Sequence, residues 1–334
     1  MANVINTVPV QETEGYNLYV KPLLDDPQIQ SLPFDMLVGP FKNHELYFTQ
    51  NLDKISSKKV ACGWNFNGST DVTKKTLVPV EIEAAVEQCY TPLINTIYAG
   101  GLPDGWRRGE LSAEVLAFMA TRQQYAFNRD LLSFLFLGDT ISAVPYYTPF
   151  DGIYKKLKAG ANASDGTVFA GAITASDLNA TNFFATMKGI YDAQNRQLKG
   201  VAKNAKTWIW TEAVYDAYLN YLYVSTQTNA GIIQRESIVN GLEANFFLNI
   251  PILVVPIVDE RLEEDFLTGS PAAPTNPYRV ILTDPSNHKL LMDANGLAQQ
   301  EAWYEKKDDT YYLIGSALIA YEYGFGDLNV IAGF

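Results

Sequence analysis

The sequence predicts a mixed α+β protein, and three observations carry this prediction. An apolar stripe at helical spacing runs through residues 112–137, helices alternate with short strands between 151 and 270, and every apolar pattern after Tyr278 is that of a strand. The chain has 334 residues, of which 47% are hydrophobic and 19% charged, so it can bury a large core and is not a disordered chain.

Residues 1–40 are predicted to form an extended arm that lies over another body. Prolines interrupt any helix in this segment, at positions 9, 22, 27, 33 and 40. The first 20 residues have no basic region followed by an apolar stretch, so no secretory signal is expected and the protein is expected to stay in a cytoplasm. The sequence has no apolar run of about 18 residues that could span a bilayer.

Residues 41–90 are predicted to form an extended β-loop. "HELYFTQ" is the outgoing strand, residues 51–75 are a polar excursion, and "TLVPVEIEAAVEQCY" is the return strand, with Val78, Val80 and Ile82 on its apolar side. Two-stranded hairpins are marginally stable in water when they stand alone. We therefore expect this β-arm to rest on another body.

The longest helix is predicted for residues 112–137, with Ser112 as its cap and Gly138 as its end. At 1.5 Å per residue its length would be roughly 39 Å. Its apolar stripe consists of Leu111, Val115, Phe118, Tyr125, Leu132 and Phe136. A polar line at a spacing of seven residues consists of Glu114, Thr121 and Asn128.

The middle of the chain is predicted as a helix, a strand and a second helix. The first helix begins at Thr174 to Asp177 and ends at Gly200, with Phe184, Met187, Tyr191 and Leu198 on its buried face. "AKTWIW" is a strand, and Thr211 caps a helix that buries Val214, Tyr218 and Leu222. "LNIPILVVPIVDE" is a strand near a sheet edge, and "YRVILTD", "KLLMD", "AWYEKK", "TYYLIGSALIAYEYGFG" and "LNVIAGF" are the late strands.

The sequence predicts no catalytic, cofactor or metal site. It has no nucleophile elbow, phosphate-binding loop or dinucleotide fingerprint. His44 begins "HELYF", where Phe48 replaces the second histidine of a zinc helix, so a surface histidine on the β-arm is favoured. His288 is expected in a turn without a nucleophile, and Cys89 is expected to be a small buried residue. The acidic run from Glu260 to Asp265 is expected to be a solvated face.

The charge of the chain argues against nucleic-acid binding, because the formal net charge is −12 and a DNA-binding face must neutralise phosphates. The only basic patch is local and lies around the polar excursion. Twenty tyrosines, 17 phenylalanines and 5 tryptophans accompany this charge, and such residues pack cores and subunit contacts.

The order of elements resembles the major capsid protein of tailed bacteriophages, the Hong Kong 97-type fold. The resemblance covers nearly the whole chain and rests on "FLFLGDTISAVPYYTPFDGIYKKL", "FFATMKGIYDAQNRQLKGVAKNAKTWIWTEAVYDAYLNYL", "NPYRVILTDPSNHKLLMD" and "YEYGFGDLNVIAGF". It implies an N-terminal arm at 1–40, an extended loop at 41–90, a peripheral domain at 91–150 and 271–334 with spine helix 112–137, and an axial domain at 151–270.

By the same resemblance the chain is a structural subunit, not an enzyme, without cofactors. It would assemble with itself into hexamers and pentamers of an icosahedral head, in the host bacterial cytoplasm, and enclose double-stranded DNA without binding its sequence or a membrane. Portal, scaffolding and decoration proteins are implied as partners. The family often carries a scaffold segment or cleaved prodomain ahead of the arm, so a separate scaffold or a mature form is expected here.

Two alternatives remain open at this point. An encapsulin-like bacterial compartment shares the fold, and a carbohydrate-active or hydrolytic enzyme would need a deep pocket with convergent carboxylates. For a shell subunit, we expect intersubunit contacts at the basic and aromatic residues of the loop and of the joint before the spine helix: Lys54, Lys58, Lys59, Trp64, Phe66, Lys74, Lys75, Trp106, Arg107 and Arg108.

Overall fold

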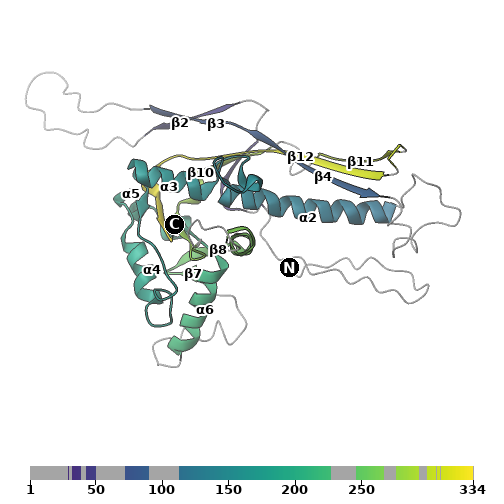
Figure 1. Ribbon diagram of the computed structural model, residues 1–334. Helices are drawn as coiled ribbons and strands as arrows, with labels where there is room; N and C mark the ends of the chain where they lie inside the picture. The colour runs from purple at the N-terminus through teal and green to yellow at the C-terminus, as the bar shows by residue number, and fades with distance from the viewer. Residues whose placement is uncertain are drawn as a thin grey trace, which may run out of the picture.

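The computed structural model describes residues 29, 32–38, 43–49, 72–89, 113–226, 246–266, 276–292, 299–305, 307–308 and 310–333. Figure 1 shows a lobe built around a sheet and flanked by helices, an elongated part in which a long helix lies beneath three strands, and a two-stranded pair that projects from the junction. The mixed α+β class predicted from the sequence is therefore confirmed.

A six-stranded sheet forms the centre of the first lobe. Its order is β5 (Val168–Phe169), β13 (Asn329–Ala332), β9 (Val280–Thr283), β6 (Thr207–Trp210), β8 (Ile250–Val254) and β7 (Phe246–Phe247). The last strand, β13, lies between β5 and β9, and Val330, Ile331 and Ala332 are fully buried. The predicted strand "LNVIAGF" is thus confirmed, and the chain returns at its end to complete a sheet that its middle leaves open.

The helices of this lobe are α3 (Ile153–Ala163), α4 (Phe183–Asp192), α5 (Arg196–Gly200), α6 (Glu212–Thr226) and α8 (Pro256–Arg261), which continues as the π-turn η5 (Leu262–Phe266). The predicted single helix from Thr174 to Gly200 is wrong, because Asn195 adopts an extended conformation that separates α4 from α5. Thr174 begins a turn closed on the Asp177 carboxylate, and Phe184 is 40% exposed.

The helix α6 buries Val214, Tyr218 and Leu222 as predicted. Thr211 was predicted to cap this helix, but its hydroxyl does not bond the helix N–H groups and donates instead to the carbonyl oxygen of Pro277, 2.6 Å away. The carboxylate of Asp259 on α8 instead accepts the N–H groups of Glu212, at 2.6 Å, and Ala213, at 3.3 Å. The predicted strand before α8 ends at Val254, since Pro256 starts this helix.

A five-stranded sheet forms the elongated part. It consists of β1 (Asp35–Val38), β10 (His288–Met292), β12 (Thr310–Tyr323), β11 (Gln299–Glu305) and β4 (Val80–Cys89), and β12 pairs with β10, β11 and β4. The long helix α2 (Ala113–Leu137) lies along one face. Ala317, Ile319 and Tyr321 of β12 point into the core on that side.

The predicted helix at 112–137 is confirmed, because α2 ends at the predicted residue and begins only one residue later than predicted. Leu132 and Phe136 are fully buried, as the apolar stripe predicted, while the side chains of Val115 and Phe118 lie outside the described ones. Asn128, from the predicted polar line, is buried and its Oδ1 accepts the Ile29 N–H at 3.1 Å.

The segment predicted as an N-terminal arm belongs in part to the body. Ile29, Leu32 and Phe34 are buried in the main core, and β1 pairs in parallel with β10. Residues 1–28 lie outside the described residues. The described residues of this segment thus contact their own subunit, and the arm at 1–40 stays a prediction.

The β-arm consists of β2 (His44–Thr49) and β3 (Val72–Leu77), which pair antiparallel. The predicted return strand is wrong in its extent, since the chain bends at Val78 and Pro79 and β4 pairs with β12 instead. Val80 and Ile82 turn toward the core as predicted, but Val78 is 58% exposed.

Short 3₁₀ turns connect these elements, namely η3 (Pro145–Tyr147), η4 (Lys203–Ala205), η6 (Pro285–Asn287) and η7 (Gly326–Leu328). No helix within the described ranges has the length and apolar character needed to cross a membrane. The predicted domain division stays a prediction, but β9 and β13, from residues 271–334, share a sheet with β6 and β8 of the predicted axial domain.

Candidate functional site

The root of the β-arm is the place where the projecting pair β2–β3 meets the body. Leu77 is buried against Leu291 and Ala320, on the face of the five-stranded sheet opposite α2, and Leu46 packs against the same cluster. The same face of the pair contacts the body nearly to its outer end, through Lys75 and Phe48. The opposite face, which carries Tyr47 and Lys74, is exposed. The arm is therefore attached to the body by one face and open on the other within the described chain.

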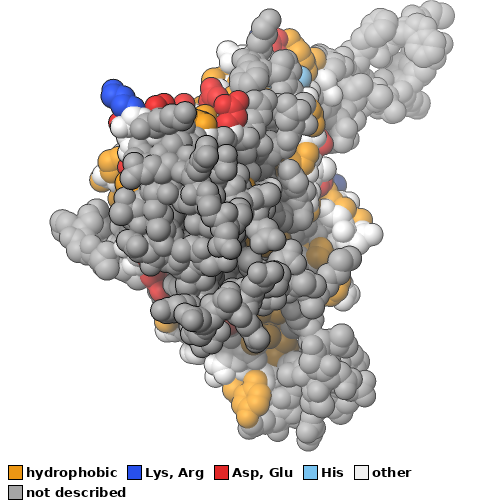
Figure 2. Space-filling view, turned by 90° about the vertical axis from the view of Figure 1, so that its right-hand side faces the viewer, with side chains coloured by type: hydrophobic (Ala, Val, Ile, Leu, Met, Phe, Trp, Pro, Cys, Tyr) orange, Lys and Arg blue, Asp and Glu red, His pale blue; other side chains and the backbone are white. Residues whose placement is uncertain are grey.

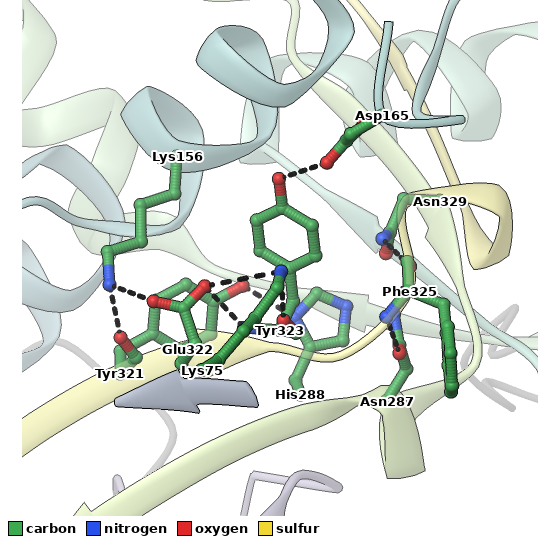
Figure 3. A network of polar contacts seen from close by, with 10 residues as sticks. All are labelled: Lys75, Lys156, Asp165, Asn287, His288, Tyr321, Glu322, Tyr323, Phe325 and Asn329. Carbon is green, nitrogen blue, oxygen red and sulfur yellow. Dashed lines mark hydrogen bonds and ion pairs between the residues drawn. The ribbon is translucent and has the colours of Figure 1, made fainter. Parts of the chain in front are cut away.

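Lys75 is the main polar anchor of this root (Figure 3). Its ammonium group donates to the carbonyl oxygen of Tyr323 at 2.8 Å and lies 4.1 Å from the centre of the same residue's ring. The Glu322 carboxylate lies 3.6 Å away. Because the ammonium is only partly exposed, these contacts together fix how the β2–β3 pair is oriented on the end of β12.

Tyr323 and Glu322 connect this anchor to the first lobe. The Tyr323 hydroxyl donates to Asp165 at 2.5 Å, and Lys156 of α3 donates to Glu322 at 2.8 Å and to the carbonyl oxygen of Tyr321 at 2.5 Å. Burial raises the pKa of Asp165, but hydrogen bonds from Tyr323 and Thr167 outweigh it and the net pKa lies below its usual value. The carboxylate therefore stays charged and holds Tyr323 in place.

A turn at Gly324 lets the arm approach closely. Phe48 of β2 packs edge-on against Phe325, with ring centres 5.5 Å apart, and the Asn287 side chain bonds both the N–H and the carbonyl oxygen of Phe325. A Cβ atom at Gly324 would lie 2.6 Å from the Phe48 ring and 2.9 Å from the Asn287 Oδ1. Glycine is required here because any side chain would displace the arm.

His288 lies beneath the root and joins the two sheets. It is fully buried as the first residue of β10, so the prediction of a histidine in a turn is wrong. Its Nε2 lies 2.7 Å from the Thr283 hydroxyl, which donates to Asn329, and its Nδ1 lies 2.7 Å from the Tyr321 hydroxyl. Burial lowers the pKa of His288 to about 3, so the ring is neutral and works as one donor and one acceptor.

Of the predicted contact residues, the structure describes Lys74 and Lys75. Lys74 is exposed on β3 and pairs with Glu45 across the arm, whereas Lys75 turns inward to the root. The remaining contact residues lie outside the described residues: Lys54, Lys58, Lys59, Trp64, Phe66, Trp106, Arg107 and Arg108. The intersubunit role of the whole set stays a prediction. Sequence reasoning missed Tyr323, Glu322 and Gly324, which look like ordinary strand and turn residues.

The other candidate groups have structural surroundings. His44 is exposed on β2 as predicted, while Cys89 is exposed at the end of β4, so the prediction of a buried Cys89 is wrong. The acidic run is not simply solvated, because Glu260 pairs with Arg129, and Asp265 accepts the Tyr147 hydroxyl. Within the described chain no three His, Cys, Asp or Glu side chains converge as metal ligands.

A cavity of about 370 Å³ lies between the end of α2, α3 and η5. Its charged lining residues are Asp139, Lys155, Lys158 and Arg279. Lys155 bonds Asp139 at 2.5 Å and Asp151 at 2.7 Å, so the carboxylate in the lining is held in an ion pair. This cavity does not offer the two opposed carboxylates that hydrolysis of a sugar bond requires.

A body that completes its own core but carries a projecting arm with one exposed face is typical of subunits that build larger assemblies. No protein-family model and no curated protein matches the sequence. Solved structures do match it, at low identity and over nearly its whole length.

Three of these structures illustrate the likeness. A chain of Gordonia phage Cozz aligns with a TM-score of 0.61 and 9% identity, covering 95% of this chain and 88% of the other. The capsid of a native GTA particle gives 0.60 and 11%, covering 98% and 97%. The capsid of Myoviridae phage XM1 gives 0.57 and 11%, covering 99% and 97%. The chain therefore has the Hong Kong 97-type fold predicted from its sequence.

Proposed function

We propose that this chain is the major capsid protein of a tailed bacteriophage, the structural and non-enzymatic subunit of an icosahedral head. Copies would form hexamers and pentamers, and the closed shell would enclose double-stranded DNA in the virion. The observation that carries this proposal is the β2–β3 arm, which packs on the body by one face and exposes the other, on a body with the fold of capsid chains.

The charge of the chain supports enclosure without binding. A subunit with a net charge of −12 repels DNA on balance, so the shell would confine the genome without binding it. Neighbouring subunits would cover the arm, and repeated contacts between different surfaces would close the shell. Portal, scaffolding and decoration proteins are proposed as further partners on the family resemblance alone.

The arm can be tested by shortening it without disturbing its root. Thr49 and Val72 are paired at the outer end, so residues 50–71 can be replaced by an Asn-Gly turn that matches a two-residue hairpin. We expect the purified full-length protein to form shells in electron micrographs and to sediment as large particles. The shortened variant should keep its melting temperature and remain in small species.

Two outcomes would contradict the proposal. One is a full-length protein that stays a monomer under every assembly condition, including co-expression with the neighbouring genes. The other is a shortened variant that forms shells as efficiently as the full-length protein. Shells filled with an enzyme in place of DNA would identify the encapsulin-like compartment instead.

A further inference from the structure

The cavity between the end of α2, α3 and η5 lies where the two parts of the molecule meet (Figure 1). Its volume of about 370 Å³ is in the range of small-ligand pockets. Part of its lining is apolar and consists of Leu137, Ala159, Leu262 and Phe266, together with the buried ring of Tyr154. The cavity can therefore take an apolar side chain out of water.

The charged part of the lining is mainly cationic. Lys155, Lys158 and Arg279 line the cavity, against one carboxylate, that of Asp139. Lys155 already pairs with Asp139, whereas Lys158 is exposed and has no ion pair among the described residues. The opposite end of the molecule faces the viewer in Figure 2 and carries acidic side chains along its upper edge. A cationic cavity is therefore a local exception in a chain with a net charge of −12.

The guanidinium group of Arg279 is held over an aromatic ring. Its central carbon lies 4.8 Å from the centre of the Tyr154 ring, and its Nε donates to the carbonyl oxygen of Asn276 at 3.4 Å. Burial lowers the pKa of Arg279 by more than Tyr154 and Asp259 raise it. An oxyanion in the cavity would stabilise the charged guanidinium, which presents parallel N–H groups that match a carboxylate.

A rigid turn forms the rim of the cavity. The Thr140 N–H and hydroxyl both donate to Asp151 at 2.9 Å, and the Ile141 N–H donates to Asp139 at 2.9 Å. Ser142, the next residue, lines the cavity. The Ile141 side chain is 82% exposed although its backbone is fixed. An apolar side chain on a fixed backbone loses less conformational freedom when a partner packs on it.

This combination of lining and rim fits the C-terminal residue of a peptide. Such a residue carries a carboxylate and a side chain on the same carbon atom, so one group meets the cations while the other enters the apolar lining. Inorganic phosphate would satisfy the cations only, and an internal acidic side chain would bring two flanking chain segments to the cavity. Capture of a terminal carboxylate is a recurring mode of peptide recognition.

We propose that this cavity binds the C-terminal carboxylate and the last, apolar side chain of a partner polypeptide. Arg279 and Lys158 bind the carboxylate. Leu262 and Phe266 surround the side chain, and Ile141 packs against the residue before it. The site goes beyond the proposed shell function, because its lining belongs to one subunit and its ligand is a separate polypeptide.

Matched small probes test this chemistry. N-acetyl-L-phenylalanine carries a ring and a carboxylate, its amide carries the ring without the charge, and acetate carries the charge alone. Calorimetric titration of the purified full-length protein should give a dissociation constant on the order of 1 mM for N-acetyl-L-phenylalanine. The amide, acetate and inorganic phosphate should each bind at least about tenfold more weakly.

Two pairs of variants place the binding. Ala159 and Ala163 are both exposed on α3, but only Ala159 lines the cavity. A159W should fill the cavity and abolish binding, while A163W should bind as wild type does. K158M should weaken binding about fivefold, whereas K199M, which removes an exposed lysine of α5, should leave it unchanged. Thermal melting checks that each variant is folded.

The inference is overturned if the amide binds as tightly as the acid, or if the folded A159W variant binds as A163W does. Phosphate that binds more tightly than N-acetyl-L-phenylalanine would show a simple anion site and would overturn it too. Shell assembly does not enter these measurements, so the proposed function stands or fails separately.

Discussion

The six-stranded sheet and the β2–β3 arm use similar apolar residues to opposite effect. In the sheet, Val330 and Ile331 are fully buried between two neighbouring strands. On the arm, Tyr47 is 63% and Val72 57% exposed, although each lies in a regular strand. The difference lies in whether the chain supplies a second layer for the strand to pack on.

This comparison separates stability from assembly. The sheet stabilises the subunit because its apolar side chains leave water on folding, at roughly 1.5–3 kcal/mol for a fully buried aliphatic or aromatic side chain. The arm gains little from its own fold beyond the root, so its exposed area remains available for contact with another copy. Changes in the first region should lower melting temperature, and changes in the second should alter assembly.

The largest expected effect is the loss of β13. Deleting residues 327–334 removes a strand that pairs on both sides, which should cost several kcal/mol and prevent stable folding, because domains are stable by only about 5–15 kcal/mol. Circular dichroism and thermal melting measure this. The variant with residues 50–71 replaced is the control, and a truncated protein that melts like wild type would refute the role given to β13.

A matched pair of phenylalanines gives the next effect. Phe136 is fully buried on α2, so F136A should lower the free energy of unfolding by about 3–5 kcal/mol. Phe184 is 40% exposed on α4, and F184A should cost less than about 1 kcal/mol. Urea denaturation compares the two, and equal losses would mean that α2 does not carry the core.

His288 predicts a pH dependence of stability. Its pKa is about 3 in the folded protein and about 6.5 when unfolded, so the unfolded chain binds the extra proton between these values. Stability should be complete above about pH 6.5 and should fall by about 1.4 kcal/mol per unit as the pH drops below it.

The variant H288Q isolates this effect, because glutamine does not ionise in this range. Denaturation between pH 6.5 and 5 should show a shallower pH dependence for H288Q than for wild type. Asp259, whose pKa is raised to about 6 mainly by burial, is present in both proteins and cancels in the difference. Identical slopes would mean that the ring is not held in its neutral form.

The smallest effect is expected at the arm root. K75M removes the bond to Tyr323 and should weaken the root by about 1 kcal/mol, while K74M removes only an exposed pair with Glu45. Amide exchange of β2 and β3 should rise about fivefold in K75M and stay unchanged in K74M, with little change in global melting. Equal exchange in the two variants would show that Lys75 does not hold the arm.

Sequence patterns predicted the elements whose periodicity is strong and local. The stripe of α2 and the buried face of α6 were predicted from spacing, and the late strands were predicted from their short apolar runs. Pairing partners were harder to predict. The prediction placed residues 76–90 opposite β2, whereas the bend at Pro79 sends β4 to β12, which lies more than 200 residues further along the chain.

The sequence by itself determined the long helix α2, the buried face of α6 and that the chain is acidic, because these depend on residues close together in the chain. Only the tertiary structure decided that Lys75 faces Tyr323 while Lys74 faces solvent, that Asp259 and not Thr211 caps α6, and that His288 is buried. Each of these depends on contacts between residues far apart in sequence, whose energies no local pattern contains.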